Sequence, residues 1–203
     1  MPAPEHILAG LHAIANDVLP IAIVWHLLAS TTIAGVALGW RPTRRVVGML
    51  LALPAASVAV MAWTYGNPFN GAVFTALAAT LGFLGLRLPA RPLGRAPAWA
   101  IALGGLMVVF GLVYPHFVEV ESWLTYLYAA PTGLVPCPTL AVMIGIALAA
   151  DGLGDRGWSL VLAGAGLFYG VFGIARLGVT LDVGLIAGAS GLLARAMMLD
   201  ARR

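Results

Sequence analysis

The sequence predicts an all-α membrane protein, a bundle of about seven transmembrane helices, and three observations support this class. First, 61% of the 203 residues are hydrophobic and 9% are charged. A water-soluble domain carries roughly 25% charged residues, so this composition cannot cover a soluble surface. Second, the apolar runs recur at the length that crosses a bilayer, and third, arginines cluster between them. We therefore expect a single transmembrane domain over residues 1–203, embedded in the lipid bilayer.

Seven apolar segments are long enough to be interpreted as spans. They cover residues 18–39, 45–64, 70–87, 98–115, 134–150, 157–175 and 182–199. Pairs of glycines four residues apart predict close helix contacts, at Gly35 and Gly39, Gly166 and Gly170, and Gly184 and Gly188. We expect these faces to pack spans within one chain, with a homo-oligomer contact as the alternative.

Two amphipathic helices are predicted to lie in the membrane interface. Before the first span, apolar residues recur at helical spacing, at Ile7, Leu8, Leu11 and Ile14. In the fourth connection, apolar residues again share one helical face, at Phe117, Val120, Leu124 and Leu127. The second of these helices would lie beside aromatic residues of the kind that anchor a protein at the interface.

The arginines predict the orientation of the chain, because loops rich in arginine stay in the cytoplasm. They occur in the first, third and fifth connections and at the carboxyl end: Arg41, Arg44, Arg45, Arg87, Arg91, Arg95, Arg156, Arg195, Arg202 and Arg203. The second and fourth connections contain none, and the sixth contains Arg176. We therefore expect the amino terminus outside and the carboxyl terminus in the cytoplasm.

Composition also excludes some classes of function. The pI near 9.5 does not indicate a nucleic-acid partner, because the basic residues are arginines at the ends of spans. The chain has no lysine, which excludes a retinal Schiff base. It has one cysteine, Cys137, so an intramolecular disulfide is excluded. The first residues lack the basic region and cleavage site of a signal peptide, so we expect them to be retained.

The most distinctive local pattern is PTGLVPCPT, where Pro136 and Pro138 bracket Cys137. A residue before proline avoids the helical region, and proline fits the first position of a helix. We therefore expect Pro138 to begin the fifth span and Cys137 to cap it. Free backbone N–H groups at that position would favour a thiolate. The alternative is that the prolines only start the span and the thiol is a small buried apolar group.

Metal-ligating residue types occur near this cysteine on the predicted outer side. His116 and Glu119 are three residues apart and would share a face of the predicted interfacial helix. Together with Cys137 they predict a site for a metal ion, and imidazole with thiolate suits copper or zinc. Further donors on that side are His12, Asp17, Glu121 and Asp182. The alternative is a solvated acidic loop anchored by aromatic residues.

Ionisable residues within the spans are few. His26 is in the middle of the first span, where such a group is expected to face a cavity or a partner. With Asp17 and Asp182 it is predicted to line a pore or cavity, the alternative being a neutral histidine bonded to Ser30 or another hydroxyl. At the ends of spans, Arg195 is expected to extend to the interface, and Arg176 to pair with Asp182.

The chain resembles a family of bacterial multi-pass membrane proteins, domain of unknown function 6064. The resemblance rests on Asn67–Pro68, Tyr114–Pro115, the stretch YAAPTGLVPCPT from Tyr128 to Thr139, and the final GVTLDVGLIAGASGLL. It covers nearly the whole chain, and the APT and VPCPT stretches are its specific part. The resemblance implies the multi-pass topology and a bacterial inner membrane, singles out Pro136, Cys137 and Pro138, and implies no activity.

These features favour a function in which a small solute or metal ion is handled or transported through an outward-facing site. His26, His116, Glu119 and Cys137 would line it, with the interrupted start of the fifth span directing N–H groups inward. One alternative is a non-catalytic accessory or assembly subunit of a larger membrane complex. Another is a membrane enzyme with Cys137 as nucleophile and His116 as base. The sequence leaves open whether the chain is an enzyme and favours a non-enzymatic function.

Overall fold

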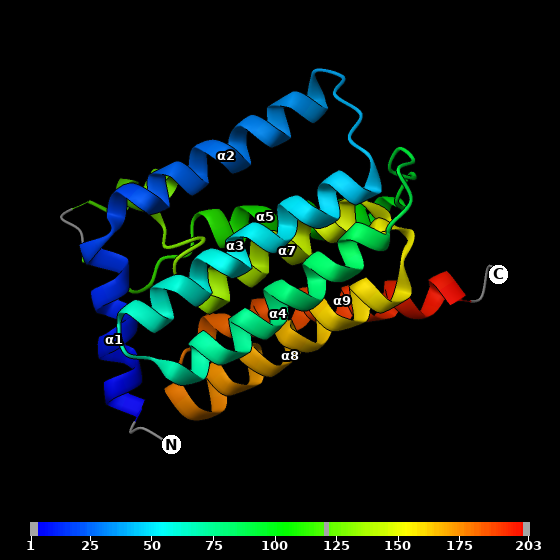
Figure 1. The fold of residues 1–203 in the computed structure, drawn as a ribbon. Coiled ribbons are helices and arrows are strands. Elements are labelled where there is room, and N and C mark those ends of the chain that lie inside the picture. Colours follow the sequence, from blue (N-terminus) through cyan, green and yellow to red (C-terminus); the bar gives the residue numbers. More distant parts are fainter. Residues whose placement is uncertain (1–3, 120–121, 201–203) are drawn as a thin grey trace.

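The computed structural model describes residues 4–119 and 122–200, and in these ranges its regular elements are helices joined by turns and loops. The long helices that lie side by side in Figure 1 are α2 (Leu19–Ala37), α3 (Arg44–Thr64), α4 (Pro68–Arg87), α5 (Ala98–Leu112), α7 (Pro136–Ala149), α8 (Arg156–Leu177) and α9 (Val183–Asp200). Helix α1 (Pro4–Asp17) lies across one end of this bundle. Short helices complete the connections: η1 (Trp123–Thr125), α6 (Tyr126–Ala129), η2 (Asp151–Gly154) and η3 (Thr180–Asp182).

Five segments in the described part of the chain are helical, long and apolar enough to cross a membrane. They are Leu19–Val36, Arg44–Thr64, Pro68–Arg87, Arg156–Leu177 and Thr180–Leu199. Helices α5 and α7 are apolar but shorter, with 15 and 14 residues. At about 1.5 Å per residue, α7 is shorter than the roughly 30 Å hydrocarbon core of a bilayer. The all-helical class is thus confirmed, and five helices are candidate membrane spans, while the seven spans and their orientation stay predictions.

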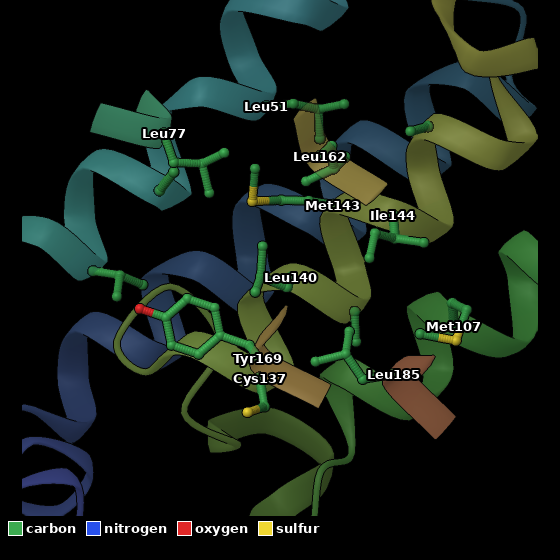
Figure 2. Close-up of a cluster of buried hydrophobic side chains, with 14 of the residues drawn as sticks. Leu51, Leu77, Met107, Cys137, Leu140, Met143, Ile144, Leu162, Tyr169 and Leu185 are labelled. Atoms are coloured by element: carbon green, nitrogen blue, oxygen red, sulfur yellow. The ribbon is translucent and has the colours of Figure 1, made fainter. Parts of the chain in front are cut away.

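Helix α7 forms the centre of the bundle. Its residues are buried from Pro136 to Gly145, and Figure 2 shows Leu140, Met143 and Ile144 among side chains of the surrounding helices. Helix α5 packs closest to it, because a Cβ added at Gly104 would lie 2.6 Å from the carbonyl oxygen of Gly145. A central helix with neighbours on all sides needs an apolar surface all round, and the uniform hydrophobicity of this segment provides one.

The predicted glycine faces pack spans within the chain at two of three places. Gly166 faces Ile144 and Ala189, and Gly188 faces Met107. The pair Gly35 and Gly39 does not form a helix face, because α2 ends at Ala37 and Gly39 follows it with a φ of 107°. A backbone in this left-handed region is favourable for glycine, so Gly39 turns the chain out of the helix.

Helix α2 lies apart from the rest of the bundle (Figure 1). Its first half is attached: the indole of Trp25 donates to Ser57 Oγ at 3.0 Å, and His26 Nε2 lies 2.8 Å from the carbonyl oxygen of Leu112. From Leu27 onward its described side chains are exposed or half-buried, and Leu27 itself is 62% exposed. Among the described residues, the side-chain hydrogen bonds from α2 to the bundle thus come from its first half.

The end of the bundle opposite α1 contains a buried ion pair. Arg195 Nη2 lies 2.6 Å from Asp151 Oδ1, and Nε donates to the same oxygen at 2.8 Å. The prediction that Arg195 extends to the interface is wrong, because its side chain is turned inward and is 1% exposed. A buried carboxylate gives the guanidinium the partner that solvent would otherwise supply.

Candidate functional site

The segment that leads into α7 is buried although it is not helical. Residues 130–135 lie inside the protein, where backbone groups must find partners within the chain. The hydroxyl of Thr139 accepts from the N–H of Gly133 at 2.8 Å, and that of Thr132 donates to the carbonyl of Gly111 at 2.7 Å. Gly133 has a φ of 78°, and its missing side chain makes room for the indole of Trp25. The APTG sequence thus folds into a turn that the surrounding helices cover.

Cys137 lies inside the first turn of α7 and does not cap it. The helix begins at Pro136, with Val135 as its cap, so the prediction that Pro138 begins the helix is displaced by two residues. Both prolines still fit, because the first four N–H groups of a helix have no acceptor within it. The side chain of Cys137 is buried.

The thiol of Cys137 belongs to a hydrogen-bonded cluster around Asp182. Cys137 Sγ donates to Asp182 Oδ2 at 3.2 Å, and the phenol of Tyr114 donates to Asp182 Oδ1 at 2.8 Å. A thiol can donate this bond only in its protonated form, and a thiolate would be repelled by the carboxylate. The geometry therefore favours a neutral thiol, in contrast to the thiolate expected for a capping position.

Asp182 is fully buried at the start of α9, in the turn that follows α8. Gly173 of α8 makes this position possible, since a Cβ there would collide with the carboxylate. The predicted pairing of Asp182 with Arg176 is replaced by the bonds to Tyr114 and Cys137, and Arg176 is exposed. In the described part of the chain, both hydrogen bonds that this side chain accepts come from neutral groups.

A small cavity adjoins this cluster. It has a volume of about 20 Å³, which is room for about one water molecule. Cys137 and Asp182 line one part of it, and Asn70 and Tyr169 line another, with the phenol of Tyr169 donating to Asn70 Oδ1 at 2.9 Å. Figure 2 shows Cys137 and Tyr169 close together below Leu140. The sequence analysis did not predict Asn70, Tyr114 and Tyr169 as parts of the site. The signal that could have found them is an amide or phenol side chain near the end of a predicted span.

Helix α1 covers the cavity from the end of the bundle. Ile7 and Leu11 contribute to its lining, and Leu11, Ile14 and Ala15 are buried against the bundle. The predicted amphipathic helix is thus present and uses its apolar side to close the site.

One side chain fixes the fourth connection to α1. Asn16 donates to the carbonyl of Phe117 at 3.0 Å and accepts from the N–H of Glu119 at 2.8 Å. These bonds occupy backbone groups that a helix would use, and Phe117 has a φ of 73°. The predicted helical face shared by His116 and Glu119 is therefore wrong. The interfacial helix is confined to the short turns η1 and α6, and Val120 and Glu121 lie outside the described residues.

The predicted metal ligands are not brought together. Cys137 contacts Asp182, His116 packs against His12 and Phe117, and Glu119 is exposed. Across residues 4–119 and 122–200, no three His, Cys, Asp or Glu side chains form a group that could hold a metal ion. Among the described residues, the hydrogen bond of the Cys137 thiol goes to Asp182 and not to His116, so the geometry does not support the pair proposed for a nucleophilic enzyme.

The other predicted cavity residues lie elsewhere. His26 is buried between two backbone carbonyls, with Nδ1 2.9 Å from that of Ala22 and Nε2 2.8 Å from that of Leu112, so it joins α2 to α5. It does not bond Ser30 as the alternative proposed. Asp17 is exposed at the end of α1, close to Tyr65. Of the three predicted cavity residues, Asp182 alone lines the cavity described above.

The stability of the segment around His116, which contacts α1, is expected to depend on pH. Burial lowers the pKa of His116 below its ordinary 6.5, and the nearby His12 lowers it further. Below pH 6.5 the unfolded segment therefore binds more protons than the folded one, and the folded segment loses stability as the pH falls toward the lowered pKa. We expect amide exchange of residues 113–119, corrected for intrinsic rates, to increase on going from pH 7.5 to 5.5.

The matched variants for this prediction are His116→Gln and His6→Gln. The first removes the titrating ring and should abolish the added exchange at low pH. The second changes an exposed histidine of α1 and should leave it unchanged. Equal exchange at both pH values in the unmodified protein would contradict the prediction.

The structure is an all-helical bundle with five candidate membrane spans and a buried polar cluster beneath α1. Comparison with protein-family models, with curated proteins and with solved structures found no match. The resemblance to domain of unknown function 6064 therefore stays a prediction.

Proposed function

We propose that this chain is a multi-pass protein of a bacterial inner membrane that handles a small solute or ion at the end covered by α1, with Asp182 as the group that binds a proton or small cation. The observation behind the proposal is a fully buried carboxylate whose hydrogen-bond donors are neutral, beside a small cavity. An ionisable residue buried in an apolar helical bundle is costly, and in membrane proteins such residues usually serve transport or proton transfer.

The chemistry of the cluster supports uptake of positive charge. An ionised carboxylate removed from water loses several kcal/mol of solvation, which two neutral donors replace only in part. A proton or a cation on Asp182 would remove this cost. Asn70 and Cys137 line the same cavity, and an amide oxygen and a sulfur are atoms that can face a positive charge.

The size of the cavity limits which ions or solutes can bind beside Asp182. Room for about one water admits a proton or a dehydrated ion, while a larger solute requires α1 to move. Asn16 and the His12–His116 contact hold α1 in place, so the cover over the cavity is attached by a few polar bonds and ring contacts. The placement of the arginines predicts that this end lies outside the cytoplasm, which supports an outward-facing site.

The test is ion flux through purified protein in liposomes, with Asp182→Asn as the variant. Proton uptake is followed with a trapped pH-sensitive dye, and zinc uptake with a trapped chelating dye, each under an imposed gradient. We expect flux of one of these ions above that of empty liposomes, reduced at least tenfold by Asp182→Asn, since Asn keeps the shape and removes the charge. The control Glu119→Gln changes an exposed carboxylate at the same end and should retain the flux.

Protein that carries neither ion faster than empty liposomes, or an Asp182→Asn variant with unchanged flux, would contradict the proposal. A second candidate is an accessory subunit of a larger membrane complex. It is favoured by α2, because only 11% of the residues in Leu19–Val36 are buried inside the protein. Its signature would be a partner protein that copurifies in fixed stoichiometry after mild solubilisation, together with absent flux.

A further inference from the structure

An apolar space lies beneath the free half of α2. One part of it, about 500 Å³, is bounded by Thr32, Ile33 and Val36 of α2 and by the Gly104, Gly105 and Val108 side of α5. A second part, about 160 Å³, lies between α2 and α3. Thr32 and Ile146 line both parts, so the two meet under the helix, with α7 as their floor.

The walls of this space are apolar, and the threonine hydroxyls in them already have hydrogen-bond partners. The hydroxyl of Thr32 donates to the carbonyl of Leu28, and those of Thr132 and Thr139 are bonded to the backbone. The space is about the size of sites that hold one small ligand, roughly 300–1000 Å³. A helix with its side chains is about 10 Å across and would cover α2 from outside, so it is not the occupant that fits beneath it.

Positive charge gathers at the end toward which the space extends. Leu93 lines the space, and the exposed Arg91 and Arg95 lie two residues to either side of it. The chain after α2 joins the same place, because the N–H of Arg44 donates to the carbonyl of Arg91 at 2.9 Å and Thr43 pairs with Pro92. The exposed Arg41 is thereby brought to this end as well.

We propose that an anionic phospholipid binds here, with an acyl chain beneath α2 and its phosphate at Arg41, Arg91 and Arg95. The hydrocarbon space and the basic rim match the two halves of such a molecule. Exposed arginines at a membrane surface attract anionic lipid headgroups, and the acyl chain replaces the contacts that α2 lacks with the bundle. This site is independent of the Asp182 cavity, which lies at the opposite end of the bundle.

Native mass spectrometry of the delipidated protein, titrated with phosphatidylglycerol or with phosphatidylcholine of identical chains, tests the proposal. We expect phosphatidylglycerol to bind about tenfold more tightly. The double variant Arg91→Gln/Arg95→Gln should remove this preference and keep the weaker binding of both lipids. Arg176→Gln, an exposed arginine at the other end, should leave the preference unchanged.

The acyl-chain part of the site is tested with a bulky side chain in the space. Gly105→Phe should abolish binding of both lipids, because Gly105 faces open space there. Gly164→Phe is the matched control, since Gly164 in α8 also has open space around it but lies away from α2. Should Gly105→Phe not fold, Val109→Trp serves in its place, because Val109 lines the same space and is 61% exposed.

Several results would overturn the proposal. Equal affinity for the two lipids would remove the headgroup assignment, and unchanged lipid binding by Gly105→Phe and Val109→Trp would remove the site. A protein dimer that forms without lipid, and that Gly105→Phe disrupts, would show that a second copy covers this face instead.

Discussion

Replacing Arg195 with methionine is expected to destabilise the protein by about 3–5 kcal/mol. The side chain is 1% exposed and its guanidinium contacts Asp151 through two nitrogen atoms. Methionine fills similar space but leaves the carboxylate buried without its counter-charge. The measurement is reversible unfolding in mixed micelles, followed by tryptophan fluorescence.

The double variant Asp151→Asn/Arg195→Met separates charge from packing. Asn is the appropriate replacement because Asp151 has a φ of 59°, a conformation that asparagine tolerates. With both charges absent, most of the loss should be recovered, since an apolar replacement of a buried ion pair is often nearly neutral. A double variant as unstable as Arg195→Met alone would show that the pair contributes through shape and not through charge.

The second large effect is expected from Gly104→Ala, at about 1–3 kcal/mol of lost stability. The added methyl group would lie 2.6 Å from the carbonyl oxygen of Gly145 and 3.0 Å from the backbone nitrogen of Ala149. Both are backbone atoms of α7, so no side chain can rotate away and the two helices must separate. The midpoint of thermal unfolding in detergent reports this loss.

The neighbouring glycine provides the control. Gly105 is on the same helix, and a Cβ there would meet no atom within 4 Å. Gly105→Ala should therefore leave stability unchanged or raise it by up to about 1 kcal/mol through higher helix propensity. If both substitutions lowered the midpoint equally, the effect would come from the conformation of α5 alone and not from its contact with α7.

The helices could be predicted because span length and hydrophobicity are local properties of the chain. The segment expected at 157–175 is the helix Arg156–Leu177, and that at 70–87 is Pro68–Arg87. Caps that act within three or four residues set these ends: Asp155 accepts from the N–H of Trp158, and Asn67 from that of Asn70.

The polar contacts could not be predicted in the same way. Asp182 is bonded to Tyr114 and Cys137, which are 68 and 45 residues away in sequence, and Arg195 is 44 residues from Asp151. Such pairs form because whole helices pack together, and they leave no periodic pattern in a single sequence. The fourth connection differs from the prediction for a related reason: Asn16, about a hundred residues earlier, binds the backbone of Phe117, and this contact replaces the expected helix.

The central position of α7 has a consequence for how the chain is assembled during synthesis. This helix is short, and the non-helical residues before it have polar backbone groups that lipid cannot satisfy. Its cover includes α8 and α9, which the ribosome produces only afterwards. When α7 emerges, these two of the helices that will surround it do not yet exist. We expect it to be held by α5, or by the insertion machinery, until the last hairpin closes over it, so that the middle of the protein is among the last parts to reach its final surroundings.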